Sequence, residues 1–303
     1  MKGMPIAATV VAALLAGSAC RPGEGETTAR QDSAEVARRE AHLAAARAQP
    51  DSGATREAPL ARWVLGGELA EISGLALTPD GRLFTHGDER GRVFELDYRR
   101  GAMVKQFMIG TRLVQADFEG ITAANDALFL LASNGSLYEF QEGTSAEQVA
   151  YTLHDTRLGH ECEFEGVAFD STLNTLLLAC KNVLSAGPIR DSLVIYRWKL
   201  PNGGGVRPSR LTVPLARVIG ANRWRGLHPS DITVDPLSGN YVLIAAQENA
   251  LIEITPAGEL VFARPLPPGL AHAEGVAITR DSMLIISTEA GRRSAAITLY
   301  RWP

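Results

Sequence analysis

A five-residue motif that recurs five times constrains the fold of this chain more than any other feature. In each copy an acidic residue or His is followed by one spacer, Ser or Glu, usually Gly, and an aliphatic residue. The copies are Glu71-Ile-Ser-Gly-Leu75, Asp117-Phe-Glu-Gly-Ile121, Glu163-Phe-Glu-Gly-Val167, His228-Pro-Ser-Asp-Ile232 and His272-Ala-Glu-Gly-Val276. Their starts at 71, 117, 163, 228 and 272 are 46, 46, 65 and 44 residues apart. Repeats in this range are typical of β-propeller blades, which are four-stranded antiparallel sheets.

Short apolar runs between turn residues predict the strands inside each repeat. The first repeat has such runs at 74–77, 82–85, 93–96 and 104–108, and the second has an Asn134-Gly135 hairpin signal. The third repeat is 19 residues longer than the first two (65 against 46), and we assign the surplus to loops. A sixth, degenerate blade within it is the alternative. The sequence therefore predicts an all-β, five-bladed propeller.

The two ends of the repeat region predict how the ring closes. The fifth repeat ends after three strands, and the run 61–65 precedes the first motif without a blade of its own. This run can supply the fourth strand of the last blade, which removes open sheet edges. We therefore expect the N- and C-terminal strands to close the ring of a propeller domain that spans residues 61–303.

The N-terminal 60 residues predict export and anchoring. Lys2, the apolar run 6–15 and the small residues before Cys20 are typical of a signal peptide over 1–19, and Cys20 is placed as in a lipobox, although Gly17 departs from that pattern. Plain secretion, with Cys20 as a stray thiol, is the alternative. Residues 20–60 are polar and predict a disordered tether, with a transient helix over 35–47. The expected location is the cell membrane or outer membrane, facing the periplasm or exterior, with a lipid on Cys20 in the bilayer.

The five motif starts and the loops between second and third strands belong to the same end of a propeller, so their side chains are expected to meet at one mouth of the channel. The motif carboxylates are the candidate metal ligands: Glu71, Asp117, Glu119, Glu163, Glu165, Asp231 and Glu274. The same face collects further candidates for ligand contact, which are Asp88, Glu89, Asn134, Arg223, Trp224, Arg225, His228, Glu248 and Glu289.

So many carboxylates at one mouth would repel one another unless they were protonated or neutralised by a cation. Oxygen donors in number suit Ca²⁺, and the nearby His228 and His272 keep a transition metal open. The alternative is that each Glu caps backbone N–H groups or pairs with Arg223, Arg225 or Lys181. The net charge of −4 without a basic block argues against a nucleic-acid partner.

The serial order of DFEGI, EFEGV, HPSDI and HAEGV, together with GDERGRVFEL and AAQENALIEITPAG, resembles the SdiA-regulated (YjiK-like) family over residues 63–302. The resemblance implies a five-bladed propeller on exported or membrane-anchored bacterial proteins, with a calcium site on the blade-start carboxylates. It implies no biochemical activity. Ser73 and Ser230 stand where the other three repeats have Glu, so a symmetric metal ring is not expected.

Cys162 and Cys180 form a candidate disulfide. Folding the hairpin around residues 171–173 places residues near 164 opposite Cys180, so the two cysteines become diagonal neighbours. An oxidising compartment would allow a bond between them. Two buried free thiols are the alternative, and no CxxC spacing points to zinc.

The chain carries no GxSxG, HExxH, P-loop or GxGxxG motif. Two main functions remain open, beside a third in which calcium is only a scaffold and the long loops of the third repeat, such as 183–190, carry partner contacts. The first is a non-enzymatic calcium-binding propeller that presents the mouth to a protein or a small ligand. The second is a calcium-dependent lactonase-, phytase- or esterase-like hydrolase, in which the metal polarises the substrate. For the hydrolase the expected ligands are Glu119, Glu165 and Glu274, with Glu163 or His272 as the base.

Overall fold

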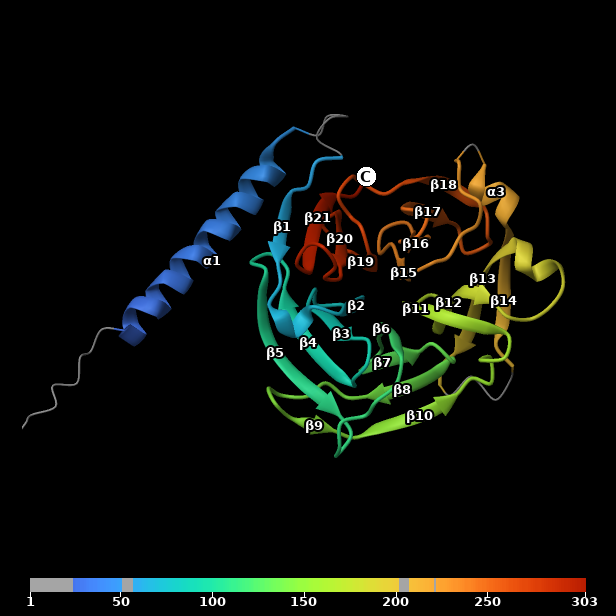
Figure 1. Ribbon diagram of the computed structural model, residues 1–303, viewed down its shortest axis with the longest axis horizontal. Coiled ribbons are helices and arrows are strands. Elements are labelled where there is room, and N and C mark those ends of the chain that lie inside the picture. The colour runs from blue at the N-terminus through green and yellow to red at the C-terminus, as the bar shows by residue number, and fades with distance from the viewer. Residues whose placement is uncertain (1–23, 51–56, 202–206, 221) are drawn as a thin grey trace, which may run out of the picture. The chain divides into compact units, whose positions relative to one another are not determined.

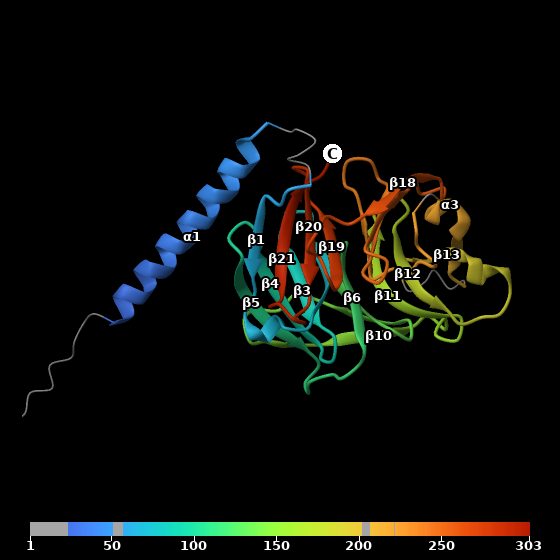
Figure 2. The same ribbon diagram turned by 45° about the horizontal axis from the view of Figure 1, so that its top comes forward.

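The computed structural model describes residues 24–50, 57–201, 207–220 and 222–303, with side chains from residue 33 onward. The chain divides into two compact units, Met1–Arg38 and Arg39–Pro303. Cys20 and the predicted signal peptide lie outside the described residues. The second unit contains all the strands, which form five antiparallel blades arranged in a ring (Figures 1 and 2). The prediction of a five-bladed propeller is confirmed, and no sixth blade is present among the described residues.

Blades 1 to 4 are built from strands in chain order from the centre of the ring outward. Blade 1 contains β2 (Ile72–Leu77), β3 (Leu83–Gly87), β4 (Arg92–Asp97) and β5 (Ala102–Ile109). Blade 2 contains β6 (Phe118–Ala124), β7 (Ala127–Ala132), β8 (Ser136–Phe140) and β10 (Tyr151–Asp155). Blade 3 contains β11 (Cys162–Asp170), β12 (Thr175–Val183), β13 (Ser192–Lys199) and β14 (Ser209–Pro214). Blade 4 contains β15 (Asp231–Val234), β16 (Tyr241–Ala245), β17 (Ala250–Ile254) and β18 (Leu260–Pro265).

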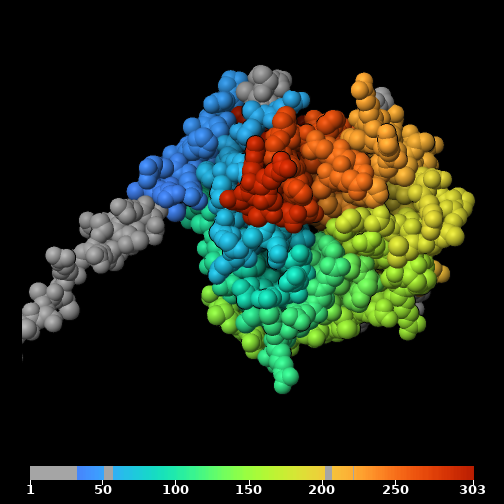
Figure 3. All heavy atoms as spheres, in the orientation of Figure 1, coloured from blue at the N-terminus to red at the C-terminus, as the bar shows by residue number. Residues whose placement is uncertain are grey.

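Blade 5 closes the ring with strands from both ends of the propeller. Its inner strands are β19 (Ala273–Ile278), β20 (Met283–Thr288) and β21 (Ala296–Arg301), and its fourth strand is β1 (Ala61–Val64). β1 runs antiparallel to β21, with Trp63 opposite Ile297. Figure 3 shows the light-blue start of the domain beside the red C-terminal segment. The predicted closure by the first and last strands is confirmed.

In the described part of the chain, the hydrophobic core forms five clusters, one at each blade interface. Phe84 and Phe107 of blade 1, for example, pack in one cluster with Phe118 and Leu130 of blade 2. Every residue of β16 and β17 is buried, whereas the outer strand β10 exposes most of its residues. Inner strands therefore read as continuous apolar runs because both of their faces meet a neighbouring blade.

One strand was not foreseen in the sequence. β9 (Gln148–Val149) pairs in parallel with β5, so the connection between β8 and β10 of blade 2 adds a fifth strand to blade 1. Glu142 in that connection forms ion pairs with Arg82 and Lys105 of blade 1. Blades 1 and 2 are thereby joined along their outer edges as well as through their core.

The surplus of the third repeat lies in loops and short helices, as expected. It includes the 3₁₀ helix η2 (Pro188–Asp191) and the five-residue helix α3 (Leu215–Ile219), and another 3₁₀ turn, η1 (Gly67–Leu69), precedes blade 1. Where a disordered tether was predicted over residues 20–60, the structure describes helix α1 (Glu24–Ala48). Within the second unit, Leu43 of this helix is buried in one cluster with Trp63. No helix among the described residues is long and apolar enough to cross a membrane.

Candidate functional site

The recurring Glu of the motif is the extra residue of a β-bulge in three blades. Glu119 is skipped between the pairs Phe118–Ala132 and Gly120–Leu131. Glu165 and Glu274 are skipped in the same way at the starts of β11 and β19. A bulge re-aims the side chain of the extra residue, and bulges are frequent next to functional sites. The motif therefore encodes a local backbone irregularity that separates the Glu from the sheet pattern.

The glycine that follows each bulge lets neighbouring blades approach one another. A Cβ on Gly120 would lie 2.9 Å from the backbone nitrogen of Val167, and one on Gly166 would lie 2.7 Å from Cα of Asp231. These distances are too short for any side chain. The motif glycines are thus required by the close packing of the inner strands around the axis.

Glu119, Glu165 and Lys181 form a coupled cluster between blades 2 and 3. Lys181 donates a hydrogen bond to Glu165 Oε1, and the two form an ion pair. Burial, with the negative charges of Glu165 and Asp117, raises the pKa of Glu119 to about 9. Burial also raises the pKa of Glu165, although the Lys181 ammonium opposes it. The Lys181 ammonium therefore neutralises part of the negative charge of the two glutamates. A proton or a second cation is needed to neutralise the remaining charge.

Glu274 of blade 5 faces the same mouth in company with His272 and Glu289. Burial raises the pKa of Glu274 to about 7, and the carboxylates of Glu289 and Glu165 add to the effect. His272 Nδ1 lies 3.4 Å from Glu289 Oε1. One ligand atom from each of these three residues can be chosen so that all lie within 4.8 Å of one another.

Asp231 of blade 4 occupies the motif position that is Gly in the other four blades. The β15–β16 pairing begins at Asp231, opposite Ile244, and the backbone N–H of Ser230 also donates to the Ile244 carbonyl. Asp231 is completely buried, and its Oδ2 accepts a hydrogen bond of 2.8 Å from the backbone N–H of Val276 in blade 5. Burial raises its pKa well above the usual range. Predicted as a metal ligand, Asp231 lies inside the ring rather than among the mouth carboxylates.

The two motif serines link neighbouring blades. Ser73 Oγ donates to the carbonyl of Glu119 over 3.3 Å, and Ser230 Oγ donates to the carbonyl of Ala273 over 2.8 Å. Each hydroxyl thus joins its own blade to the next one in the ring. The two serines therefore link blades at the motif position where the other three blades carry Glu.

The other predicted metal ligands have separate environments. Glu71 and Asp117 are exposed, and the pKa of Glu71 is raised by the nearby Asp88 carboxylate, then by burial and by Glu89 and Glu289. Glu163 accepts a hydrogen bond of 2.7 Å from Asn182. Asp88 Oδ1 is buried without a hydrogen-bond partner among the described residues. Together these groups extend the negative charge of the mouth from blade 1 to blade 3.

Among the residues predicted for ligand contact, His228 and Glu248 form a pair. His228 Nδ1 is 2.7 Å from Glu248 Oε1, and the other carboxylate oxygen accepts the backbone N–H of His228. Arg223 and Arg225 are exposed, while Trp224 packs against the core between blades 3 and 4. Asn134 is exposed and accepts the backbone N–H of Ser136, as an Asx turn requires.

Two cavities lie at opposite ends of the inner strands. The one at the motif end has a volume of about 650 Å³ and is lined by residues that include Glu165, Lys181, His228, His272 and Glu274. The one at the other end, of about 690 Å³, is lined by the ends of the inner strands and by turn residues. Its charged groups are Asp80, Arg99, Arg280 and Asp281, two of each sign, and Arg99 forms an ion pair with Asp281. The unbalanced charge is concentrated at the motif end, which is therefore the candidate site.

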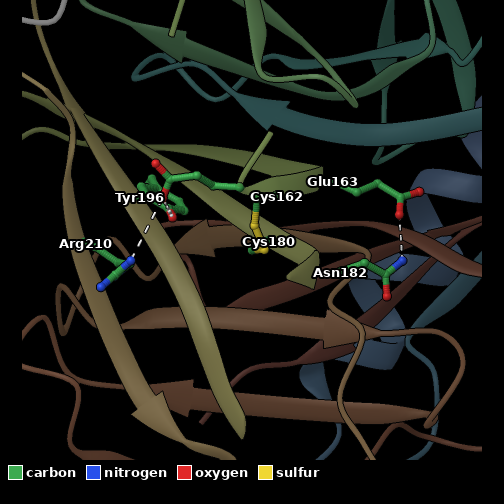
Figure 4. Close-up of a disulfide and its surroundings, with 7 residues drawn as sticks. Cys162, Glu163, Cys180, Asn182, Tyr196 and Arg210 are labelled. Carbon is green, nitrogen blue, oxygen red and sulfur yellow. Dashed lines mark hydrogen bonds and ion pairs between the residues drawn. A yellow bond between two sulfur atoms is a disulfide. The ribbon is translucent and has the colours of Figure 1, made fainter. Parts of the chain in front are cut away.

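A disulfide joins Cys162 and Cys180 at the edge of blade 3, with their Cα atoms 5.7 Å apart (Figure 4). Phe164 lies opposite Cys180 in the β11–β12 pairing, the diagonal arrangement that the hairpin predicted. Figure 4 also shows the hydrogen bond from Asn182 to Glu163, which joins the same two strands close to the disulfide. The cross-link thus fixes the two strands that carry Glu163, Glu165 and Lys181.

The fold and the acidic mouth define the class of the protein as a five-bladed β-propeller. Glutaminyl cyclase from Myxococcus xanthus matches it with a TM-score of 0.55 and 12% identity, over 80% of this chain and 94% of that one. A luciferin-regenerating enzyme matches with a TM-score of 0.52 and 9% identity, over 80% and 95%. Streptogramin B lyase matches with a TM-score of 0.42 and 14% identity, over 80% and 72%.

At these identities the likeness shows the propeller fold alone. No protein-family model matches the chain, and no curated protein matches it. The residues of the mouth must therefore carry any functional conclusion.

Proposed function

We propose that the chain is a cation-dependent binding propeller, whose mouth holds a divalent ion and presents it to a small polar ligand or a protein segment. The observation that carries this proposal is the convergence of the bulged Glu119, Glu165 and Glu274 on one acidic mouth. Lys181 offsets only part of that charge. Ca²⁺ is the proposed ion for the carboxylate set, because it accepts six to eight oxygen ligands in irregular geometry.

The carboxylate pKa values support the same proposal. Two carboxyl groups in contact hold a shared proton when no cation is present, and a bound cation displaces that proton. The pKa of Glu119, raised to about 9, indicates that this carboxyl group holds a proton at neutral pH. Binding of the ion should therefore release protons into a weak buffer.

We further propose that the protein is exported and held at a membrane through a lipid on Cys20, as a member of the SdiA-regulated family. The Cys162–Cys180 disulfide supports an oxidising compartment, where such bonds persist. Labelling of the full chain with a radioactive fatty acid, lost in Cys20→Ala, tests the anchor. Unlabelled, fully soluble wild-type protein would contradict it.

The hydrolase remains the second candidate because of one observation. Glu274, with a pKa of about 7, lines the 650 Å³ cavity beside His272, and groups that titrate near neutral pH suit acid–base catalysis. In this reading a bound ion polarises an ester or phosphoester, and Glu163 or His272 takes the proton of the attacking water. Turnover of a lactone or phosphoester panel, abolished by EDTA, would establish this function.

Thermal unfolding of the chain without residues 1–20 tests the leading proposal. We expect Ca²⁺ to raise the melting temperature of EDTA-treated protein, since an ion that binds only the folded state stabilises it. Glu119→Gln together with Glu165→Gln should remove the shift. Glu253→Gln, which changes an acid away from the motif end, is the matched control and should keep it. No shift with any divalent ion would overturn the proposal.

A further inference from the structure

His272, Glu274 and Glu289 bring three metal-ligating atoms together at the edge of the mouth. One imidazole nitrogen and one oxygen from each carboxylate lie within 4.8 Å of one another. The His272 Nδ1–Glu289 Oε1 distance of 3.4 Å equals the edge of a tetrahedron around an ion with bonds of about 2.1 Å. The His272 and Glu289 donor atoms are thus spaced for an ion before any ion binds, and a Glu274 oxygen lies within 4.8 Å of them.

The backbone of blade 5 places these three side chains. The N–H of Glu289 donates to the carbonyl of His272 over 3.2 Å, which joins the loop after β20 to the motif start. The next N–H, of Ala290, donates to the carbonyl of Ala70 and fixes the same loop to the start of blade 1. Glu274 is turned out of the sheet by its bulge. The cluster is therefore held by main-chain contacts on both sides.

The charge of this cluster is only partly compensated by neighbouring side chains. Lys181 forms its ion pair with Glu165 and acts on Glu274 only at longer range. Among the residues that the structure describes, no Lys or Arg forms an ion pair with Glu274 or Glu289. A partly buried carboxylate is unfavourable unless a cation or a proton neutralises it.

We propose that His272, Glu274 and Glu289 form a site for a first-row transition ion, for which Zn²⁺ is the best match, with an open position toward the 650 Å³ cavity. One imidazole and two carboxylates suit Zn²⁺ or Mn²⁺, whereas Ca²⁺ takes oxygen ligands. The inference rests on the proposed cation-binding function and adds to it a transition-ion site on blade 5, which shares Glu274 with the carboxylate set proposed for Ca²⁺.

The cavity supplies a second group that would act on whatever occupies the open position. His228 lines the same cavity as His272 and Glu274, and the Glu248 carboxylate contacts its Nδ1. This contact keeps the proton on Nδ1 and leaves the Nε2 lone pair free. The ligand class that fits is a small molecule with an oxygen donor for the ion and a proton that His228 can accept.

Metal binding to the chain without residues 1–20 tests the proposal. After treatment with EDTA, titration with Co²⁺ should give the visible absorption of a four- or five-coordinate ion, and Zn²⁺ should displace it at one ion per chain. His272→Asn should weaken Zn²⁺ binding at least tenfold, as should Glu289→Gln. Asn is chosen because His272 has a φ of +56°, a conformation that Asn tolerates.

His160→Ala is the matched control, since His160 is an exposed histidine that lies beside Glu161 outside this cluster. It should leave the Co²⁺ spectrum and the Zn²⁺ affinity unchanged. Zn²⁺ binding that is lost in His160→Ala and kept in His272→Asn would overturn the site. Ca²⁺ binding that needs Glu119 and Glu165, without any binding of Co²⁺ or Zn²⁺, would overturn the site and leave the proposed function standing. No binding of any ion would overturn both.

Discussion

Blades 3 and 4 are neighbours in the ring, yet they use the same motif in opposite ways. In blade 3 the bulged Glu165 reaches the mouth and Gly166 follows it. In blade 4 a serine takes the position of that Glu, and Asp231 stands in the glycine position with its carboxyl enclosed by the ring. An acidic residue of the motif is thus a candidate binding group at the Glu position, and a structural group at the glycine position.

The largest expected effect on stability comes from adding a side chain at Gly166, the blade 3 glycine against which blade 4 packs. In Gly166→Ala the new Cβ would meet backbone atoms of Asp231 and Ile232 at 2.7–2.8 Å, and neither can move alone. We expect a loss of about 3 kcal/mol or more in the free energy of unfolding, measured by chemical denaturation. Gly87→Ala, whose nearest contact would be 3.6 Å, is the control and should cost less than about 1 kcal/mol. Equal stability of the two variants would show that the blades can separate freely.

The cross-link of blade 3 gives the next effect. Cys180 lies opposite Phe164 just before the bulge, where blade 2 has Ala132 opposite Phe118 and no disulfide. The double variant Cys162→Ser/Cys180→Ser releases a loop with a sequence separation of 18, so we expect the free energy of unfolding to fall by ~3 kcal/mol. The denaturation midpoint of the wild type under reducing conditions should fall to the same value. A midpoint that a reducing agent leaves unchanged would contradict the bond.

Asp231 provides the converse test in blade 4. Asp231→Ala leaves the backbone N–H of Val276 buried without its acceptor, and we expect a cost of ~2 kcal/mol in unfolding free energy. Because burial raises the pKa of Asp231 well above its usual range, the neutral Asp231→Asn should cost less than the Ala variant. If Asn were as damaging as Ala, the carboxyl group would have to be ionised in the folded protein.

The sequence predicted the ring because the motif spacing and the apolar runs report on local structure. The hairpin at Asn134-Gly135, the strand Tyr241–Ala245 and the closing strand at 61–64 all follow from short-range patterns. β9 was missed, since two residues in parallel pairing have no periodicity to detect. The structural role of Asp231 was missed because its carboxyl contacts the backbone of the neighbouring blade, and the motif describes only its own blade.

The sequence predicted which residues lie at the candidate site, but it predicted only part of how they contact one another. The sequence brought the right elements to one end of the ring, but it could not assign Lys181 to Glu165 or group His272 with Glu274 and Glu289. Such contacts depend on the directions in which side chains of different blades point. The spacing of residues along the chain does not predict these directions. The aligned offset of 15 residues between the Glu of the motif and Glu289 was the available signal for the last group.

Blade 1 allows the smallest and most selective test, because it places a histidine against its own bulge. His86 is completely buried opposite the Ser73–Gly74 bulge, and its Nε2 has no hydrogen-bond partner among the described residues. Burial lowers the pKa of His86 to about 4. Between the unfolded value of about 6.5 and this lower value, the unfolded chain binds more protons, so stability falls as the pH falls.

Because of His86, we expect the free energy of unfolding of the wild type to fall by ~1 kcal/mol from pH 7.5 to pH 6, and further at lower pH. The mouth carboxylates titrate in the opposite sense, because their raised pKa values favour the folded state as protons bind. The effect must therefore be measured as the difference between the wild type and His86→Gln at each pH. The variant should be less stable at pH 7.5, and its stability should depend less on acid. If the free energy of unfolding depended on pH in the same way in both proteins, His86 would not be held neutral in the folded state. The interior of blade 1 would then tolerate a charged side chain, as the mouth at blade 3 does.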